Sequence, residues 1–439
     1  MNFGVIGYGY WGPNVVRNLA SLDGSQVISI AELSEKAQQR ALKAHPGAHV
    51  TANAHEVIAS KDIDAIAIIT PVWTHYELAK AALENGKHVF VEKPFTSTTE
   101  QGERLIELAL KKNLKIMVDH TFLFTGAVKK ISQLLDEGTL GRLYYYDSTR
   151  VNLGLFQHDI NVLWDLAPHD LSIMDHLIKE SPEAIVATGQ SHLNCHEDVA
   201  FMTLYFPDNV IAHINVNWLS PVKVRTTLIG GEKRMLVWND LEADEKLKVY
   251  DKGVRINSRE GVYELLVSYR SGDMWAPQLE QVEALHQELS YFVECVSSGK
   301  DPHNDGCAGL RVVKMLEAAT ESAARVNDPR LIPFHDPKHQ LGRAMARTLG
   351  WKQHVAWDTY FIYRAGAHWT GQEMPVPEFW HHQLKDREVW EQTAEAELGS
   401  SEWTQALPKK SEADPAHFAT GEDLRIALAE AVSKAGSTT

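Results

Sequence analysis

Cysteine is scarce in this chain, and the few cysteines do not form a recognisable set. Only Cys195, Cys295 and Cys307 occur among 439 residues. Their number is odd and their spacing fits no metal-ligand pattern, so the sequence predicts reduced thiols and a cytoplasmic location. No compact cluster of histidine, cysteine and acidic residues stands out, and we expect no bound metal.

Long apolar runs and an excess of basic residues are also missing. No apolar run approaches the ~20 residues that a membrane helix requires, and Met1 leads directly into a predicted strand, so we expect neither a membrane span nor a signal peptide. Acidic residues outnumber basic ones by 58 to 43, giving a formal charge of −15, which argues against a nucleic-acid or anionic-membrane partner. With 44% hydrophobic and 23% charged residues, the composition is that of a globular protein, and the length predicts two or three domains.

A glycine-rich turn near the N-terminus indicates nucleotide binding. Residues 3–6 have the pattern of a buried strand, residues 7–12 are Gly-Tyr-Gly-Tyr-Trp-Gly, and helical spacing follows. Glycines at this spacing between a strand and a helix allow a tight turn and bring the backbone close to a pyrophosphate, which the helix N-terminus attracts. The predicted cofactor contacts in this turn are Gly7, Gly9, Tyr10, Trp11 and Gly12.

An acidic residue after the second predicted strand points to NAD. Glu32 follows residues 27–31 and lies about 20 residues beyond the glycine turn, where an acid accepts hydrogen bonds from the adenosine ribose and repels a 2′-phosphate. A solvated acid at the start of the next helix is the alternative. We favour the ribose role and therefore expect NAD as the cofactor, in preference to NADP.

Strand and helix patterns then alternate, as expected for a doubly wound parallel sheet over residues 1–121. Strands are predicted at 65–69, 88–91 and 115–118, and the first is entirely apolar, as in a sheet covered on both faces. Ligands bind outside the carboxyl ends of such strands. The polar residues expected there are Thr70, His75, Glu92 and Lys93, although His75 and His120 could equally be capping groups.

A second domain is predicted over residues 122–330. Consecutive strand patterns without intervening helices, such as 199–206 and 210–218, predict an α+β domain with a mostly antiparallel open sheet. Asp165 and His169 are four residues apart at the start of a predicted helix, so they would share a helical face. An imidazole near a carboxylate is a sensible general acid–base. Asp165 could instead cap the helix.

Two residues on the predicted strand 143–151 and just beyond it could reach the substrate. Arg150 and Asn152 follow the crossover between the first two domains. An arginine is a natural bidentate partner for a diphosphate, and a surface arginine on an edge strand is the alternative. Trp164, beside Asp165, is a further candidate substrate contact.

The last hundred residues have a different character. A proline-rich boundary precedes residues 340–439, which hold six of the twelve tryptophans. This aromatic content predicts a small folded C-terminal domain rather than a disordered tail. A strand is expected at 357–363 and helical spacing runs over 424–434. The role of this extension is open: it could pack on the other domains, bind a partner or form a separate module.

Three motifs carry a resemblance to a known family. Gly-Tyr-Gly-Tyr-Trp-Gly-Pro-Asn at 7–14, Glu-Lys-Pro at 92–94 and Trp-Asp-Leu-Ala-Pro-His-Asp at 164–170 resemble the Gfo/Idh/MocA oxidoreductases over roughly the first 330 residues. The resemblance implies that Lys93, Asp165 and His169 occupy the family's catalytic positions. Asn-Leu-Gly at 152–154 and the ends of the first and third motifs resemble the polysaccharide and nucleotide-sugar branch, which includes UDP-N-acetylglucosamine and UDP-N-acetylglucosaminuronate 3-dehydrogenases.

We therefore expect an NAD-dependent dehydrogenase that transfers hydride between nicotinamide and a carbinol of a sugar or UDP-sugar. His169 would be the base, Lys93 would bind the reacting oxygen, and Asp165 would orient these groups. An inositol or free-sugar dehydrogenase is the alternative, and a non-catalytic NAD-binding sensor or scaffold is the rival from another class. We expect a homo-oligomer, either a dimer or a tetramer.

Overall fold

The computed structural model describes residues 1–154, 159–193, 195–256, 267–326, 359–362 and 379–382. The chain divides into two compact units, Met1–Leu331 and Ile332–Thr439. In the second unit, β15 (Thr359–Ile362) pairs antiparallel with β16 (Phe379–His382), so the strand expected near 357–363 is present. The helical spacing at 424–434 lies outside the described residues.

The N-terminal sheet has six parallel strands in the order β3-β2-β1-β4-β5-β6. Its central strand is also the first, and the chain winds outward from it in both directions, as predicted for a doubly wound Rossmann sheet. The short β3 was not predicted because three partly exposed residues carry almost no periodic signal. The strands are β1 (Asn2–Ile6), β2 (Gln26–Ala31), β3 (His49–Thr51), β4 (Ala65–Ile68), β5 (His88–Val91) and β6 (Ile116–Val118).

Helices cover both faces of this sheet because its side chains alternate between two apolar layers. Phe3 and Phe90 pack in one layer with residues of α1, whereas Val89 and Val91 pack in the other with residues of α4 and α5. Phe292 of α8 lies 6.2 Å from Phe3 and 5.9 Å from Phe90 between ring centroids, so a helix from late in the chain completes the first layer. These helices are α1 (Gly12–Ser21), α2 (Glu35–Ala44), α3 (Ala54–Ala59), α4 (Val72–Glu84), α5 (Thr99–Lys112) and α8 (Ala284–Ser298).

The second sheet has eight strands in the order β14-β13-β12-β11-β7-β10-β9-β8. Every pair is antiparallel except β7 with β10, which confirms a mostly antiparallel sheet. The long hairpin of β13 and β14 was not predicted because its strands mix charged and glycine residues. The strands are β7 (Leu143–Leu153), β8 (Ala184–Gln190), β9 (Val199–Tyr205), β10 (Ile211–Asn217), β11 (Leu219–Gly231), β12 (Met235–Asn239), β13 (Leu247–Ile256) and β14 (Val267–Trp275).

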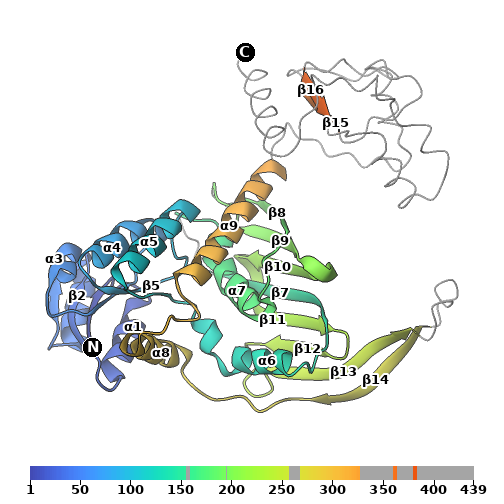
Figure 1. Cartoon of the computed structure of the whole chain (residues 1–439), viewed down its shortest axis with the longest axis horizontal. Helices are drawn as coiled ribbons and strands as arrows, with labels where there is room; N and C mark the ends of the chain where they lie inside the picture. The colour runs from blue at the N-terminus through green and yellow to red at the C-terminus, as the bar shows by residue number, and fades with distance from the viewer. Residues whose placement is uncertain (155–158, 194, 257–266, 327–358, 363–378, 383–439) are drawn as a thin grey trace. The chain divides into compact units, whose positions relative to one another are not determined.

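Two long helices, α7 (Val162–Ile178) and α9 (Gly306–Val326), lie along one face of the second sheet (Figure 1). The predicted alternation in β10 explains this, since Ala212, Ile214 and Val216 are fully buried and their neighbours are not. The 3-10 helix η1 (Thr121–Phe124) and α6 (Gly126–Asp136) connect the two sheets, and η2 (Pro207–Asn209) joins β9 to β10. The turn after β5 thereby reaches the start of α7, where Lys93 contacts Asp165.

Membrane-spanning helices and metal-binding clusters are both absent from the described part of the chain. None of its helices combines the length and apolar character needed to cross a membrane. Within the same residues, no three histidine, cysteine, aspartate or glutamate side chains group closely enough to hold a metal ion.

Candidate active site

The glycine turn between β1 and α1 has the shape of a dinucleotide cradle. Gly7 has φ of +102°, and a Cβ there would lie 2.2 Å from the carbonyl oxygen of Ile69. A Cβ on Gly12 would lie 2.4 Å from the oxygen of Gly7, so helix and strand meet too closely for a side chain. At Gly9, by contrast, an added Cβ meets nothing within 4 Å. The turn is therefore closed toward the protein and open on the side where a pyrophosphate would lie, and these residues fit NAD.

Glu32 lies against this turn. Its carboxylate accepts hydrogen bonds from the backbone N–H of Tyr8 at 2.6 Å and of Ser34 at 2.8 Å. Tyr10 is 87% exposed, whereas Trp11 is half-buried and its Nε1 donates to Asp119 Oδ2 at 2.9 Å. Trp11 thus anchors the turn to the end of β6.

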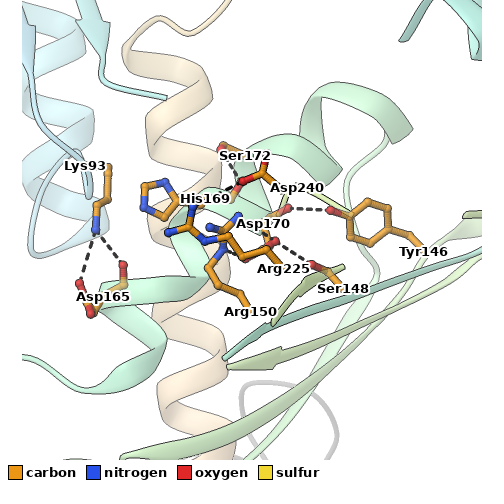
Figure 2. Close-up of polar contacts among 10 residues, drawn as sticks. All are labelled: Lys93, Tyr146, Ser148, Arg150, Asp165, His169, Asp170, Ser172, Arg225 and Asp240. Carbon is orange, nitrogen blue, oxygen red and sulfur yellow. Dashed lines mark hydrogen bonds and ion pairs between the residues drawn. The ribbon is translucent and has the colours of Figure 1, made fainter. Parts of the chain in front are cut away.

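Lys93 extends from the end of β5 to the start of α7 (Figure 2). Its Nζ donates to the main-chain oxygen of Asp165 at 2.8 Å and lies 3.6 Å from Asp165 Oδ1. The side chains are 14% and 18% exposed. Asp165 Oδ2 also accepts from Trp218 Nε1 at 3.0 Å, so the carboxylate is fixed between the two domains. Lys93 and Asp165 come together as predicted.

His75 has a different position from the one we expected. It lies inside α4 rather than opening it and is completely buried. Its Nε2 is 2.7 Å from the carbonyl oxygen of Thr70, and its Nδ1 is 2.9 Å from that of Pro94. These contacts join the end of β4 to the turn after Lys93. His75 therefore supports the lysine turn, and its ring is not open to a cofactor.

His169 lies one helical turn after Asp165, between Lys93 and two guanidinium groups in Figure 2. Its ring packs edge-on against Phe122 at 5.0 Å between centroids, and its buried Nδ1 has no hydrogen-bond partner in the described chain. Burial and the nearby Lys93, Arg150 and Arg225 hold the pKa of His169 well below its usual value. The imidazole is therefore neutral at pH 7 and able to accept a proton.

Arg150 is part of the framework rather than a surface on which a diphosphate could bind. It is 4% exposed, and its Nε and Nη2 donate to the two carboxylate oxygens of Asp170 at 2.5 and 3.3 Å. Ser148 Oγ donates to the same carboxylate at 2.6 Å. The sequence suggested either a diphosphate-binding arginine or a surface arginine on an edge strand. Neither fits, because β7 is a central strand and the guanidinium is enclosed.

A second arginine, Arg225 of β11, is more accessible. Its side chain is 33% exposed and lies 3.5 Å from Asp240 Oδ2. Its guanidinium carbon lies 5.7 Å from the ring centre of Phe122, and that of Arg150 lies 4.5 Å from the same ring. The two arginines therefore frame the aromatic ring on which His169 packs.

Three carboxyl groups lie together next to the lysine turn, where Asp119 and Glu288 are buried and Glu92 is half-buried. Glu92 follows β5, Asp119 follows β6 and Glu288 belongs to α8. Burial, the charge of Asp119 and hydrogen bonding to Asp119 raise the pKa of both Glu92 and Glu288 well above the usual value. The raised pKa favours the protonated form of both carboxyl groups, which argues against a charged Glu92 in cofactor binding.

The remaining predicted residues have supporting positions. Trp164 Nε1 donates to Thr320 Oγ1 at 3.0 Å and so fastens α7 to α9. Asn152 is half-buried near the end of β7. Thr70 is half-buried, and its hydroxyl is 2.6 Å from that of Thr74 at the edge where we expected it.

Sequence reasoning missed several residues that shape the site: Asp119, Phe122, Trp218, Arg225, Asp240 and Glu288. They are distributed over three elements and three connecting segments, so no short-range spacing connects them. Trp218 was the most accessible to prediction, because a tryptophan ending an alternating strand is an amphipathic side chain whose N–H needs a partner.

Comparisons with known proteins agree with this geometry. The family model "Oxidoreductase family, NAD-binding Rossmann fold" matches residues 1–120, and "GFO/IDH/MocA C-terminal domain" matches residues 128–237. UDP-N-acetylglucosamine 3-dehydrogenase of Acidithiobacillus ferrooxidans is 26% identical over 322 residues, or 71% of this chain and 94% of that protein. A solved structure of that enzyme has a TM-score of 0.60 at 25% identity and covers 74% of this chain and 97% of its own.

A second relative acts on a different substrate. Myo-inositol 2-dehydrogenase of Thermotoga maritima is 24% identical and covers 73% of this chain and 96% of its own length. The two family models, the paired sheets and the motifs around Gly7, Lys93 and His169 together show that the chain belongs to the Gfo/Idh/MocA family of oxidoreductases.

Proposed function

We propose that the chain is an NAD-dependent dehydrogenase acting on a carbinol of a sugar or UDP-sugar, with UDP-N-acetylglucosamine or its uronate as the first substrates to test. The observation that supports this most strongly is the convergence of Lys93, Asp165 and a neutral His169 where the parallel sheet meets α7. A lysine donor beside a neutral imidazole suits the removal of a hydroxyl proton. The similarity to a UDP-N-acetylglucosamine 3-dehydrogenase supports the substrate class.

Each group has a separate task in this mechanism. Bound NAD supplies the hydride acceptor. His169 takes the hydroxyl proton on its ring, which is neutral at pH 7 because burial and, after it, the surrounding cations lower its pKa. Lys93 donates a hydrogen bond to the reacting oxygen and stabilises its developing negative charge. Asp165, held by Trp218, fixes the lysine and balances its charge.

The preference for NAD over NADP rests on Glu32. Its carboxylate is fixed by two backbone N–H groups beside the glycine turn. From that place it accepts hydrogen bonds from ribose hydroxyls and repels a 2′-phosphate.

The test is the reduction of NAD, followed by absorbance, with UDP-N-acetylglucosamine, its uronate, free N-acetylglucosamine and myo-inositol. Lys93→Ala and His169→Ala should bind NAD normally and lose turnover by about 10²–10⁴-fold, the range for an acid–base group. Reduction with myo-inositol or free sugars alone would favour the alternative substrate class, which the similarity to an inositol dehydrogenase supports. NAD binding without reduction by any compound would favour the sensor.

A further inference from the structure

One face of α7 carries polar residues away from the reaction site. The helix is otherwise largely apolar, with Leu163, Ala167, Leu171 and other residues buried. Asp165, His169, Ser172 and His176 follow one another at spacings of four, three and four, which places them on a single face. Ser172 is 4% exposed, so this polar row passes through the interior of the protein.

His120 lies next to this row and is unusual for a buried histidine. It is 1% exposed, and neither ring nitrogen has a hydrogen-bond partner among the residues that the structure describes. Burial lowers its pKa to about 4, so the ring is neutral and has one donor and one acceptor nitrogen. Buried polar groups are nearly always satisfied, so two bare nitrogens indicate contact with groups other than protein side chains.

The charges around His120 place it between two regions. Toward the reaction site, Lys93 and Asp119 shift the pKa of His120, and His120 in turn lowers the pKa of His169. On the far side, His303 and Arg311 lower the pKa of His120. A neutral imidazole can accept a proton on one nitrogen while it releases another from the opposite nitrogen. Its position and charge state therefore suit transfer between the two regions.

A small cavity lies on the far side of His120. Its volume is about 40 Å³, and it is lined by His120, Ser172, Asp175, His176, His303 and Arg311 among others. A cavity needs roughly 10–15 Å³ for a water molecule, together with two to four polar partners. This space meets both requirements, so water in it can bond the nitrogens that the protein leaves bare.

The cavity adjoins the surface. It shares Leu123, His176 and His303 with an open groove of about 890 Å³ beside α6 and α8. The rings of His176 and His303 lie 5.5 Å apart between centroids, and His303 is exposed. Polar groups thus continue from His120 through the cavity to the open groove.

We propose that His120 and the water cavity behind it carry the substrate proton from His169 to solvent. This inference rests on the proposed dehydrogenase function. The carbinol C–H bond breaks, and its electron pair passes as hydride to oxidised nicotinamide. The O–H bond breaks to form the carbonyl, and its proton passes to His169. The proton then leaves through His120 and cavity water, so one NADH and one proton are produced for each carbinol oxidised. In reduction, the same route delivers the proton inward.

The first test needs no substrate. A high-resolution crystal structure should show water in the cavity, bonded to a ring nitrogen of His120. Ala308 lines the cavity and is 6% exposed, so Ala308→Leu should displace that water while His169 stays in place. A dry cavity in the unaltered protein would overturn the proposal whatever the substrate is.

The second test follows NADH formation and proton release together in single-turnover experiments with UDP-N-acetylglucosamine and a pH indicator. The two should coincide in the unaltered protein. In His120→Phe, proton release should lag by at least about tenfold, less than the ~10²–10⁴-fold effect of removing an acid–base group, with KM unchanged. Ala308→Leu should lag similarly, and a small buffer such as imidazole should restore the rate in both.

The matched control is His286→Leu, which removes a histidine from the wide groove but not from the small cavity. It should behave like the unaltered protein. Unchanged, buffer-independent proton release in His120→Phe would overturn the relay. If no compound in the panel is oxidised, the proposed substrate fails, and the crystallographic test still decides whether a water route exists.

Discussion

Replacing Asp170 by asparagine should destabilise the first unit strongly while changing almost nothing in shape. Asp170 and Arg150 are 3% and 5% exposed at their side chains, and three hydrogen bonds from Arg150 and Ser148 reach the carboxylate. Asparagine leaves the guanidinium buried without a counter-charge. Removing one partner of a buried pair costs about 3–5 kcal/mol.

This cost should appear as a lower midpoint of thermal unfolding. With an unfolding entropy of about 2.1 cal/mol/K per residue, a unit as long as Met1–Leu331 loses roughly 1.4 °C per kcal/mol, so Tm should fall by about 4–7 °C in calorimetry. Asp136→Asn is the matched control, because its partner Lys179 forms a pair in which both side chains are 61% exposed, and such pairs contribute about 0–1 kcal/mol.

A double variant separates the buried charge from other effects of the asparagine. Arg150→Met added to Asp170→Asn removes the uncompensated charge, so it should recover most of the lost stability, since uncharged replacements of buried pairs are often tolerated. An Asp170→Asn protein that unfolds within about 1 kcal/mol of the Asp136→Asn control would refute the reasoning.

Four further outcomes are expected. Glu32→Ser should relax the preference for NAD, measured by titration with both cofactors; tighter NADP binding by the unaltered protein would contradict the ribose role. Arg225→Met removes a cation that lowers the pKa of His169, so that pKa should rise and the acid limb of the kcat/KM profile should move to higher pH. An unmoved limb would mean that Arg225 does not affect the group that titrates there. In the unaltered protein, ionisation of Glu288 should lower the free energy of unfolding as the pH rises. Glu288→Gln should remove this decrease, measured by denaturant titration. A chain of residues 1–331 should retain NAD binding, because that compact unit holds every proposed site residue.

The sign of the Glu288 effect follows from its raised pKa. A carboxyl group whose pKa is higher in the folded chain adds stability below its ordinary value of 4.5, and that contribution is lost as the pH rises through the folded value. Glutamine cannot ionise, so its variant should have a flatter stability profile above pH 4.5. An unchanged profile would mean that the pKa of Glu288 is the same in the folded and the unfolded chain.

The sequence predicted best what depends on short-range spacing. The glycine turn at 7–12, Lys93 after a buried strand and the Asp165–His169 pair each lie within one strand–turn or helical turn, so their relation follows from local geometry. Most strands of the two sheets were predictable for the same reason, whereas β3, β13 and β14 lack a clear local pattern.

Long-range pairing explains what sequence reasoning missed. Arg150 has an alternating strand around it, and nothing local shows that its neighbour across the core is Asp170, the residue after His169. His75 has helical spacing that permits either a cap or a core position, and only the fold places it against the turn after Lys93. Contacts between segments distant in the sequence therefore decide which polar side chains are buried in support of the site and which are accessible to a ligand.

The charges around His169 are arranged in pairs that favour the neutral form of its ring. Lys93 is held by Asp165, Arg150 by Asp170 and Arg225 by Asp240, so each cation is fixed by its own carboxylate and does not need the imidazole as a partner. All three cations nevertheless act on His169 and disfavour its protonated form. Two of the three carboxylates, Asp165 and Asp170, lie on α7 within six residues that also include His169. One short helical segment therefore fixes the lysine that follows β5, fixes the arginine of β7 and carries His169 between them.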